Sequence, residues 1–252
     1  MTTGHDVVLL LYQPFTGKPL APVVRWNSAG VQDDVPVGAA YALVNFPPSV
    51  VPRPIVVIAG KTTLNDGSAD TFVVAFVASM QNQLDGPKPG TMVPGFPAVF
   101  HTPGRSNTPV AIKATRDGIY VTGTTRSSLD PTRDAKMFLA KFDLPPISFP
   151  VGQQAVPRWV DISSTDGNAE AATAMDFIID TNPANGTWVY YGGERAGSDG
   201  FDLPQTAFVT VQIQDVVGAS GPNPVSRWYG WFNRPAPWGA VPTATTWVGV
   251  SI

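Results

Sequence analysis

The chain has 252 residues, of which 16 are Lys or Arg and 19 are Asp or Glu, so its net charge is −3. Charged residues make up only 14% and no Lys/Arg cluster occurs, which argues against a nucleic-acid groove. Cysteine is absent, which excludes disulfides, cysteine-ligated metals and thiol nucleophiles, and no apolar run approaches the ~18 residues of a membrane span.

Glycine and proline are abundant and spread along the whole chain. With 24 Gly and 26 Pro they make up about a fifth of the residues. Proline breaks helices and is confined to strand ends, sheet edges and turns, so this composition predicts many short strands. No stretch shows three consecutive turns of helical periodicity, and we therefore expect an all-β protein.

The first two predicted strands lie in "HDVVLLLYQP", from His5, and "PVVRWNSAG", from Pro22. Three similar units follow, at approximately 34–102, 107–162 and 169–233. In each unit an apolar strand precedes a strand that ends in glycine, and a polar turn, a third strand and an aromatic-centred fourth strand come after it. The glycines are Gly60, Gly123 and Gly192, and the aromatic residues are Trp26 near the N-terminus and then Phe100, Trp159 and Trp228. Each unit is therefore predicted to hold four antiparallel strands.

The last predicted strands lie in "GAVPTATTWVGVSI", which stops in the middle of a β-branched run. Written head to tail, the two ends of the chain read like one further unit. We therefore expect residues 1–27 and 239–252 to share one sheet. Such pairing closes a β-propeller and removes the open sheet edges. The predicted fold is a single-domain, four-bladed propeller over 1–252, with its closing blade split between the N- and C-terminal strands.

The stretch "GIYVTGTTRSSLDPTRDAKMFLAKFD", residues 118–143, is similar to the bacterial β-propeller repeat called SBBP. That repeat has an apolar-Tyr-Val-Thr-Gly strand, a polar turn, and an Asp before a closing Lys-Phe-Asp. Residues 55–77 match it less fully, and residues 187–214 match it weakly because Asp202 comes several residues early. The resemblance implies a propeller fold and a bacterial origin, and it implies no activity. With the low charge content it favours an exported or cell-surface protein, although "MTTGHD" lacks signal-peptide features.

Three aspartates, Asp6, Asp70 and Asp134, take one repeat position at the start of the third strand, and Ser251 stands at the glycine position of the split unit. We expect these carboxylates to accept hydrogen bonds from turn amides. Calcium binding is the alternative, because "NDGSAD" and "GSDGFD" carry several oxygen ligands close together. Neither stretch has the spacing of an EF-hand loop. No metal site or cofactor is therefore predicted.

Arginine precedes tryptophan in three of the fourth strands, at Arg25, Arg158 and Arg227. Strand alternation predicts that the indole packs between sheets while Arg points the other way. The stretch "WYGWFNRPAPW" crowds five aromatic residues into eleven positions, ending at Trp238. It is either core packing around the closing blade or an exposed aromatic ledge of the kind that stacks on sugar rings.

Loops that join the fourth strand to the next first strand, and the second to the third, share one face of a propeller. We expect a polar ligand on this loop face, in contact with Trp238, Arg105, Arg126, Glu194, Arg195 and Asp199. A catalytic set is not evident. The two histidines, His5 and His101, lie in different units, which excludes a His-rich metal centre, and nothing resembles G-x-S-x-G.

The leading functional hypothesis is thus a non-catalytic module that binds a polar small molecule or glycan, as a monomer or weak oligomer. One alternative is an enzyme, a hydrolase or lyase, at the channel mouth, with an acid such as Asp176 or Glu194 beside Arg105 or Arg195. The other alternative is a structural scaffold.

Overall fold

The computed structural model describes the chain except for residues 1–4, 14, 29–32, 47–50, 79–86, 130–133, 145–153, 164–168, 180–185, 199–203, 217–222 and 234–252. For 196–198, 204–210 and 223–233 it describes the backbone alone. The described residues form fourteen strands in four antiparallel sheets, which confirms the all-β prediction. No helix in this part of the chain is long and apolar enough to cross a membrane.

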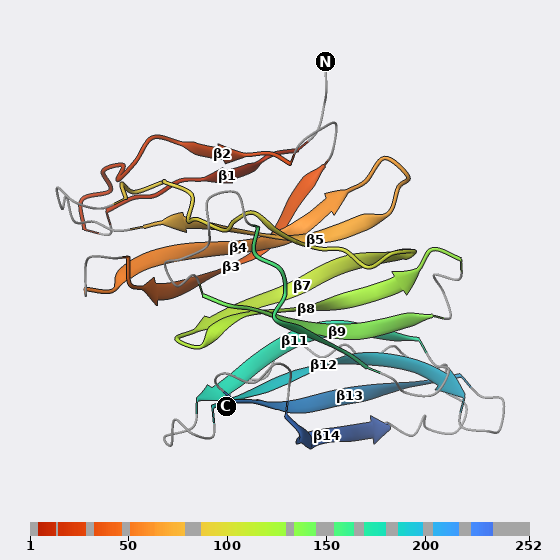
Figure 1. Ribbon diagram of the computed structural model, residues 1–252. Coiled ribbons are helices and arrows are strands. Elements are labelled where there is room, and N and C mark those ends of the chain that lie inside the picture. The colour runs from red at the N-terminus through yellow and green to blue at the C-terminus, as the bar shows by residue number, and fades with distance from the viewer. Residues whose placement is uncertain are drawn as a thin grey trace.

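Each sheet is a meander of strands that are consecutive in the chain (Figure 1). The first sheet is β1 (Val7–Leu9) and β2 (Val24–Trp26), and the second is β3 (Asp34–Val44), β4 (Arg53–Thr63), β5 (Ala69–Val77) and β6 (Ala98–Phe100). The third is β7 (Arg105–Thr115), β8 (Gly118–Ser127), β9 (Ala135–Phe142) and β10 (Trp159–Ile162). The fourth is β11 (Glu170–Ile179), β12 (Thr187–Ser198), β13 (Pro204–Asp215) and β14 (Asn223–Asn233). The second, third and fourth sheets thus have the four strands expected of each unit.

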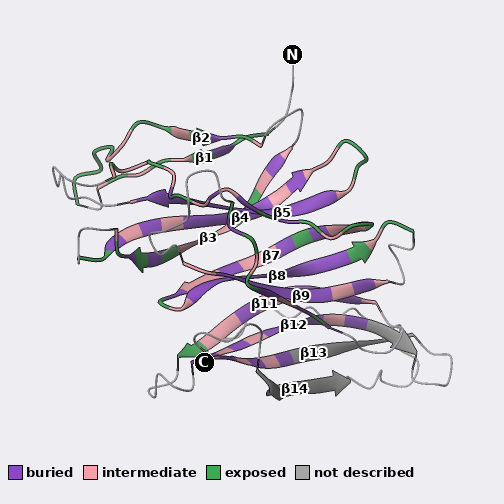
Figure 2. Ribbon diagram, viewed as in Figure 1, coloured by how far each residue is buried: buried purple, intermediate pink, exposed green. Residues whose placement is uncertain are grey.

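The sheets stack in chain order, so the first and fourth lie at opposite ends of the stack in Figure 1. Strand β7 packs against β3, β4 and β5, and β11 packs against β7, β8 and β9. One apolar core lies between each pair of successive sheets. Figure 2 shows the result: β5 is buried along its whole length, whereas β1 and β2 alternate between buried and accessible residues. The predicted closing strands, residues 239–252, are outside the described residues.

A β-bulge recurs in the first strand of all three four-stranded sheets, and it explains the glycines. The bulges lie between Pro36 and Gly38, Pro109 and Ala111, and Ala172 and Ala174. In each case the residue before the bulge pairs with a glycine of the second strand: Gly60, Gly123 and Gly193. A Cβ atom would lie 2.4 Å from the Val35 oxygen at Gly60, 2.2 Å from the Thr108 oxygen at Gly123 and 1.9 Å from the Ala171 oxygen at Gly193. The bulged strand therefore leaves room for glycine alone.

This register corrects the sequence alignment of the glycines and that of the aspartates. The third repeat glycine is Gly193, one residue after the predicted Gly192. On the third strands, Phe72 pairs with Gly60 and Phe138 pairs with Gly123, so these two phenylalanines are equivalent. Asp70 lies two residues before Phe72, whereas Asp134 lies four residues before Phe138. The two aspartates are therefore not equivalent.

The aromatic residues of the fourth strands also fall into two register classes. Trp159 pairs with Lys141 and Trp228 with Gln212, which are equivalent positions. Phe100 pairs instead with Thr71, close to the start of β5. A period-2 pattern specifies which face a residue takes but does not specify its partner on the next strand.

Candidate functional site

The predicted loop face corresponds to the end of the sheets at which β4, β8 and β12 end and β5, β9 and β13 begin (right in Figure 1). Arg105 begins β7, Arg126 lies near the end of β8, and Glu194 and Arg195 lie near the end of β12. These four predicted site residues therefore share this end. The other two, Trp238 and Asp199, are outside the described residues.

Arg105 is occupied by contacts within its own sheet. Its Nε donates to Thr125 Oγ1 at 3.0 Å and its Nη1 donates to Asp134 Oδ2 at 2.7 Å. Nη2 donates to the backbone oxygens of Thr125, at 3.3 Å, and Asp134, at 3.0 Å. The hydrogen bond from Arg105 holds the pKa of Asp134 below its ordinary value. Arg105 thus ties the ends of β8 and β9 together, and its donors are used before any ligand arrives.

Arg195 is also part of the framework. It is 6% exposed and pairs across the ladder with Glu170, which is 1% exposed. Neighbouring strand residues point to opposite faces, so Glu194 lies on the other side of the sheet from Arg195. The predicted ligand set is therefore divided between two faces. Glu194 and Arg195 therefore do not share a face of this sheet.

Asp176 is far from the predicted arginines. Its Oδ1 lies 3.4 Å from Lys113 Nζ. Lys113 is eight residues along β7 from Arg105, which corresponds to ~26 Å of extended strand. The enzyme hypothesis with Asp176 beside Arg105 is therefore wrong.

Buried polar residues recur at the start of the first strands. Counting from the bulge, Asp34, Asn107 and Glu170 are equivalent, and they are 0%, 0% and 1% exposed. Each bonds a hydroxyl at the end of the preceding sheet. Ser28 Oγ donates to Asp34 at 2.9 Å, Asn107 Nδ2 donates to Thr102 Oγ1 at 3.2 Å, and Ser163 Oγ donates to Glu170. We call these three contacts the polar clasps, and they fix each sheet to the one before it.

Two clasps leave an atom without a hydrogen bond. Asn107 Oδ1 and Glu170 Oε1 are buried and have no partner in the described residues. Burial raises the pKa of Glu170, although the Ser163 hydroxyl and the charges of Lys136 and Arg195 oppose this. The clasps were missed by the sequence reasoning, because an alignment on Gly192 places the third unit one residue out of step.

Arg126 differs from the other predicted residues because its side chain is exposed at the end of β8. It is the one described arginine of the predicted set that is open to solvent. Among the described residues no hydrogen bond or ion pair holds its guanidinium, so a cation in this position can reach a ligand.

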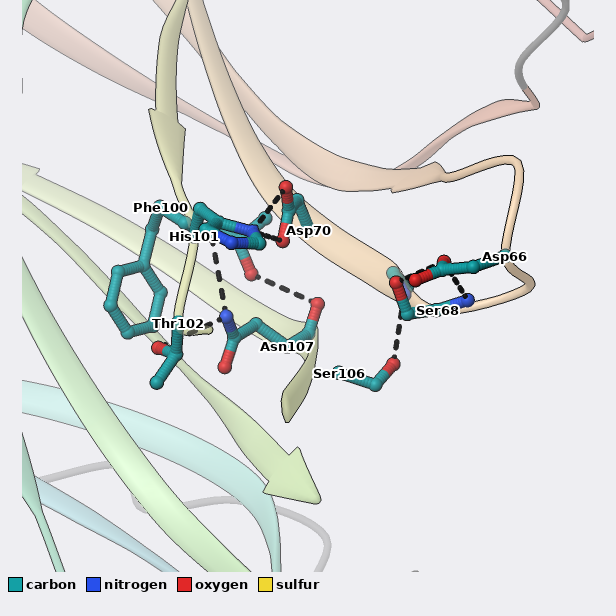
Figure 3. Close-up of polar contacts among 10 residues, drawn as sticks. Asp66, Ser68, Asp70, Phe100, His101, Thr102, Ser106 and Asn107 are labelled. Atoms are coloured by element: carbon teal, nitrogen blue, oxygen red, sulfur yellow. Dashed lines mark hydrogen bonds and ion pairs between the residues drawn. The ribbon is translucent and has the colours of Figure 1, made fainter. Parts of the chain in front are cut away.

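Asp70 and His101 form the most chemically competent pair at this end (Figure 3). His101 Nδ1 lies 2.9 and 3.0 Å from the two carboxylate oxygens of Asp70. The Asp70 side chain is 7% exposed and the His101 side chain is 52% exposed. The buried carboxylate therefore orients an accessible imidazole and leaves Nε2 free to act on solvent or a ligand. The sequence offered one usable signal, since His101 is one of only two histidines.

In the described residues the aspartates of the third strands bond other side chains, and the 130–133 turn before Asp134 lies outside this part of the chain. Asp70 bonds His101, Asp6 Oδ1 accepts from Asn27 Nδ2 at 2.7 Å, and Asp134 bonds Arg105. The turn itself is held by Asp66, whose Oδ1 accepts from the nitrogen of Ser68 at 2.9 Å and from its hydroxyl at 2.6 Å. The hydrogen bond from the Ser68 hydroxyl is the main cause that lowers the pKa of Asp66.

The described residues contain no group of three or more His, Asp or Glu that could hold a metal ion.

The tryptophan prediction is confirmed where side chains are described. Trp26 and Trp159 are 8% and 6% exposed, and Arg158 Nη1 bonds Asp143 Oδ2 at 3.0 Å away from the core.

Comparison of the chain with protein-family models, with curated proteins and with solved structures gave no match.

Proposed function

We propose that the chain is a non-catalytic binding module, which holds a polar small molecule or glycan at the loop end of its sheets. The observation that carries this proposal is the different state of the site arginines: Arg105 and Arg195 are committed to the framework, whereas Arg126 is exposed. The clasps and the Arg105 tie give a pre-organised surface, so little conformational entropy is lost when a ligand binds.

Trp238 is the proposed stacking residue. It follows Pro235 and Pro237, which restrict the backbone of "NRPAPWG". An indole held in this way offers a flat apolar surface to a sugar ring. Base–aromatic stacking, the nearest measured guide, contributes about 1–3 kcal/mol.

A glycan array, followed by calorimetry on each hit, tests the proposal. Arg126→Ala should weaken binding, while Arg116→Ala should leave it unchanged. Arg116 is a matched control because it is exposed at the opposite end of the third sheet and pairs with Asp117. The proposal fails if the protein binds none of the glycans and polar metabolites tested. It also fails if Arg126→Ala and Arg116→Ala bind them equally well.

The second candidate function is a hydrolase, and the Asp70–His101 pair is the observation that favours it. An imidazole oriented by a buried carboxylate is suited to remove a proton from water or a hydroxyl. In the described residues the ring makes no hydrogen bond other than that to Asp70. Slow turnover of a bound ligand that His101→Gln abolishes, with affinity retained, would establish this function in place of simple binding.

We also propose that the four sheets close into a four-bladed propeller, in which residues 239–252 add two strands to β1 and β2. Two observations support it: the first sheet has half the strands of the others, and its strands correspond to β5 and β6. Deletion of 247–252 should then lower the thermal midpoint of the whole protein. An unchanged midpoint would contradict the ring.

A further inference from the structure

The sheets follow a packing rule in which each third strand buries one row of side chains on the preceding sheet. In β5 this row is Phe72, Val74 and Phe76, which are 0%, 0% and 2% exposed. In β9 it is Phe138, Ala140 and Phe142, each 0% exposed. Phe72 meets Trp26 with ring centroids 4.6 Å apart, and Phe138 meets Phe100 at 5.1 Å. Trp26 and Phe100 both lie on the fourth strand of the preceding sheet.

The first sheet has the same row, but nothing described covers it. Val7 pairs with Trp26 as Thr71 pairs with Phe100, and Asp6 bonds Asn27 as Asp70 bonds His101. Val8, Leu10 and Tyr12 therefore correspond to Phe72, Val74 and Phe76. They are 51%, 53% and 53% exposed. We call this row the open face of the first sheet.

In the described part of the chain nothing covers the complementary face of the fourth sheet, apart from the contact of Asp176 with Lys113 of the third sheet. In the third sheet the paired residues Lys113, Tyr120, Lys141 and Trp159 form a cross-strand row that faces the fourth sheet. Its members bond across the interface, with Tyr120 Oη and Lys141 Nζ both 2.5 Å from Asp215 Oδ2. Trp159 Nε1 donates to Asp215 Oδ1 at 3.3 Å.

The corresponding row of the fourth sheet, by the same register, is Asp176, Tyr190, Gln212 and Trp228. Tyr190 and Gln212 are partly exposed, whereas Tyr120 and Lys141 are 0% and 2% exposed. We call this row the open face of the fourth sheet. Its residues have the same register as the row of the third sheet that packs against the fourth sheet.

We infer that the two open faces pack against each other within one chain, an interface that rests on the ring proposed above. Among the described strands, the first sheet has the third-strand row but no preceding sheet to pack on. The fourth sheet has the row that receives a following sheet, but no following sheet is among them. Figure 1 shows the first and fourth sheets at the two ends of the stack, so the sheets must curve round for the two open faces to meet. A stack with two such ends open would join head to tail into filaments. A partner in the same chain is present at an effective concentration on the order of mM, which favours closure over association.

Cysteine cross-linking tests the inference, because the chain has no native cysteine. The double variant Leu10→Cys/Tyr190→Cys is treated at low protein concentration with a short bis-maleimide linker. A cross-linked monomer is the expected product. The control Leu10→Cys/Leu129→Cys should give none, since Leu129 is 94% exposed at the β8–β9 turn and lies outside both open faces.

A linked dimer whose yield rises with concentration would overturn the inference and show that the faces join separate copies. Absence of any cross-link would overturn it as well. Leu10→Asp provides an independent readout: its unfolding midpoint should fall well below that of Leu129→Asp, because only a covered Leu10 loses burial. Glycan binding that depends on Arg126 is measured separately, so either proposal can fail while the other holds.

Discussion

Ser163 and Glu170 are joined by a hydrogen bond from the hydroxyl to the carboxylate, across the junction between the third and fourth sheets. Both groups are buried, at 1% exposure each. Ser28 donates to Asp34 in the same way, and at the third clasp the direction is reversed, because Asn107 Nδ2 donates to the Thr102 hydroxyl. Two carboxylates and one neutral amide thus hold one position, which shows that the position requires a hydrogen-bonding group near a hydroxyl and does not require a carboxylate.

Glu170→Gln should therefore keep the clasp and remove the cost of an ionised buried group. Because burial raises the pKa of Glu170 in the folded state, the folded protein binds this proton more tightly than the unfolded chain. The stability this gives is fully present below the ordinary glutamate pKa and is lost as pH rises through the folded pKa. The variant should equal the native protein in mild acid and exceed it at neutral pH, by about 1–3 kcal/mol in urea unfolding.

Glu194→Gln is the control for that series. Glu194 lies next on the ladder to Arg195 but on the other face, and it is partly exposed. Its substitution removes no buried carboxylate, so we expect only a small change in the free energy of unfolding. Equal pH profiles for the two variants would mean that Glu170 is not the group responsible.

The bulge glycines should not tolerate alanine. Gly123→Ala places a methyl group 2.2 Å from a backbone oxygen, and Gly193→Ala places one at 1.9 Å. Backbone must move in either case, so we expect losses of about 3 kcal/mol or more in the free energy of unfolding. Gly38→Ala, beside an equivalent bulge, meets only a side-chain atom of Ile112 at 3.2 Å. Its loss, measured in the same way, should be below about 1 kcal/mol.

Asp215 is the centre of the buried polar contacts between the third and fourth sheets. Asp215→Asn leaves the Lys141 ammonium, 2% exposed, without its counter-charge, and we expect a loss of about 3–5 kcal/mol. Asp143→Asn breaks the exposed pair with Arg158 and should cost less than about 1 kcal/mol.

Burial and the Asp215 charge also raise the pKa of Tyr120 above its ordinary value. Ultraviolet titration should thus find this phenol protonated when exposed tyrosines have ionised.

Trp238 and Trp159 should respond in opposite ways. Trp159→Ala removes a buried indole that packs on Tyr120, and it should cost about 3–5 kcal/mol in stability. Trp238→Ala should weaken ligand binding by roughly ten- to a hundredfold, the equivalent of the stacking term, with little change in melting temperature. Thermal unfolding and calorimetry on both variants check this. A comparable loss of stability in Trp238→Ala would place Trp238 in the core.

The all-β class and the positions of most strands followed from the sequence alone. Alternation of apolar residues and even spacing of proline are local properties, and they survive whatever the strands pack against. The repeat of apolar strand, glycine strand and polar turn was visible for the same reason. So was the burial of Trp26 and Trp159, because a large apolar residue in each unit needs an interface.

Register, and with it the site, was decided by the tertiary structure. Sequence alone does not say which of the adjacent glycines Gly192 and Gly193 pairs with the residue before the bulge, and choosing Gly192 hides the match of Glu170 with Asp34. Partners come from distant parts of the chain: Tyr120 bonds Asp215, 95 residues away, and Asp70 bonds His101, 31 residues away. Composition shows that Arg105 and Arg126 are both cations. Only the packing of neighbouring strands makes one an internal tie and leaves the other exposed to solvent, because burial and pairing are properties of the assembled sheets.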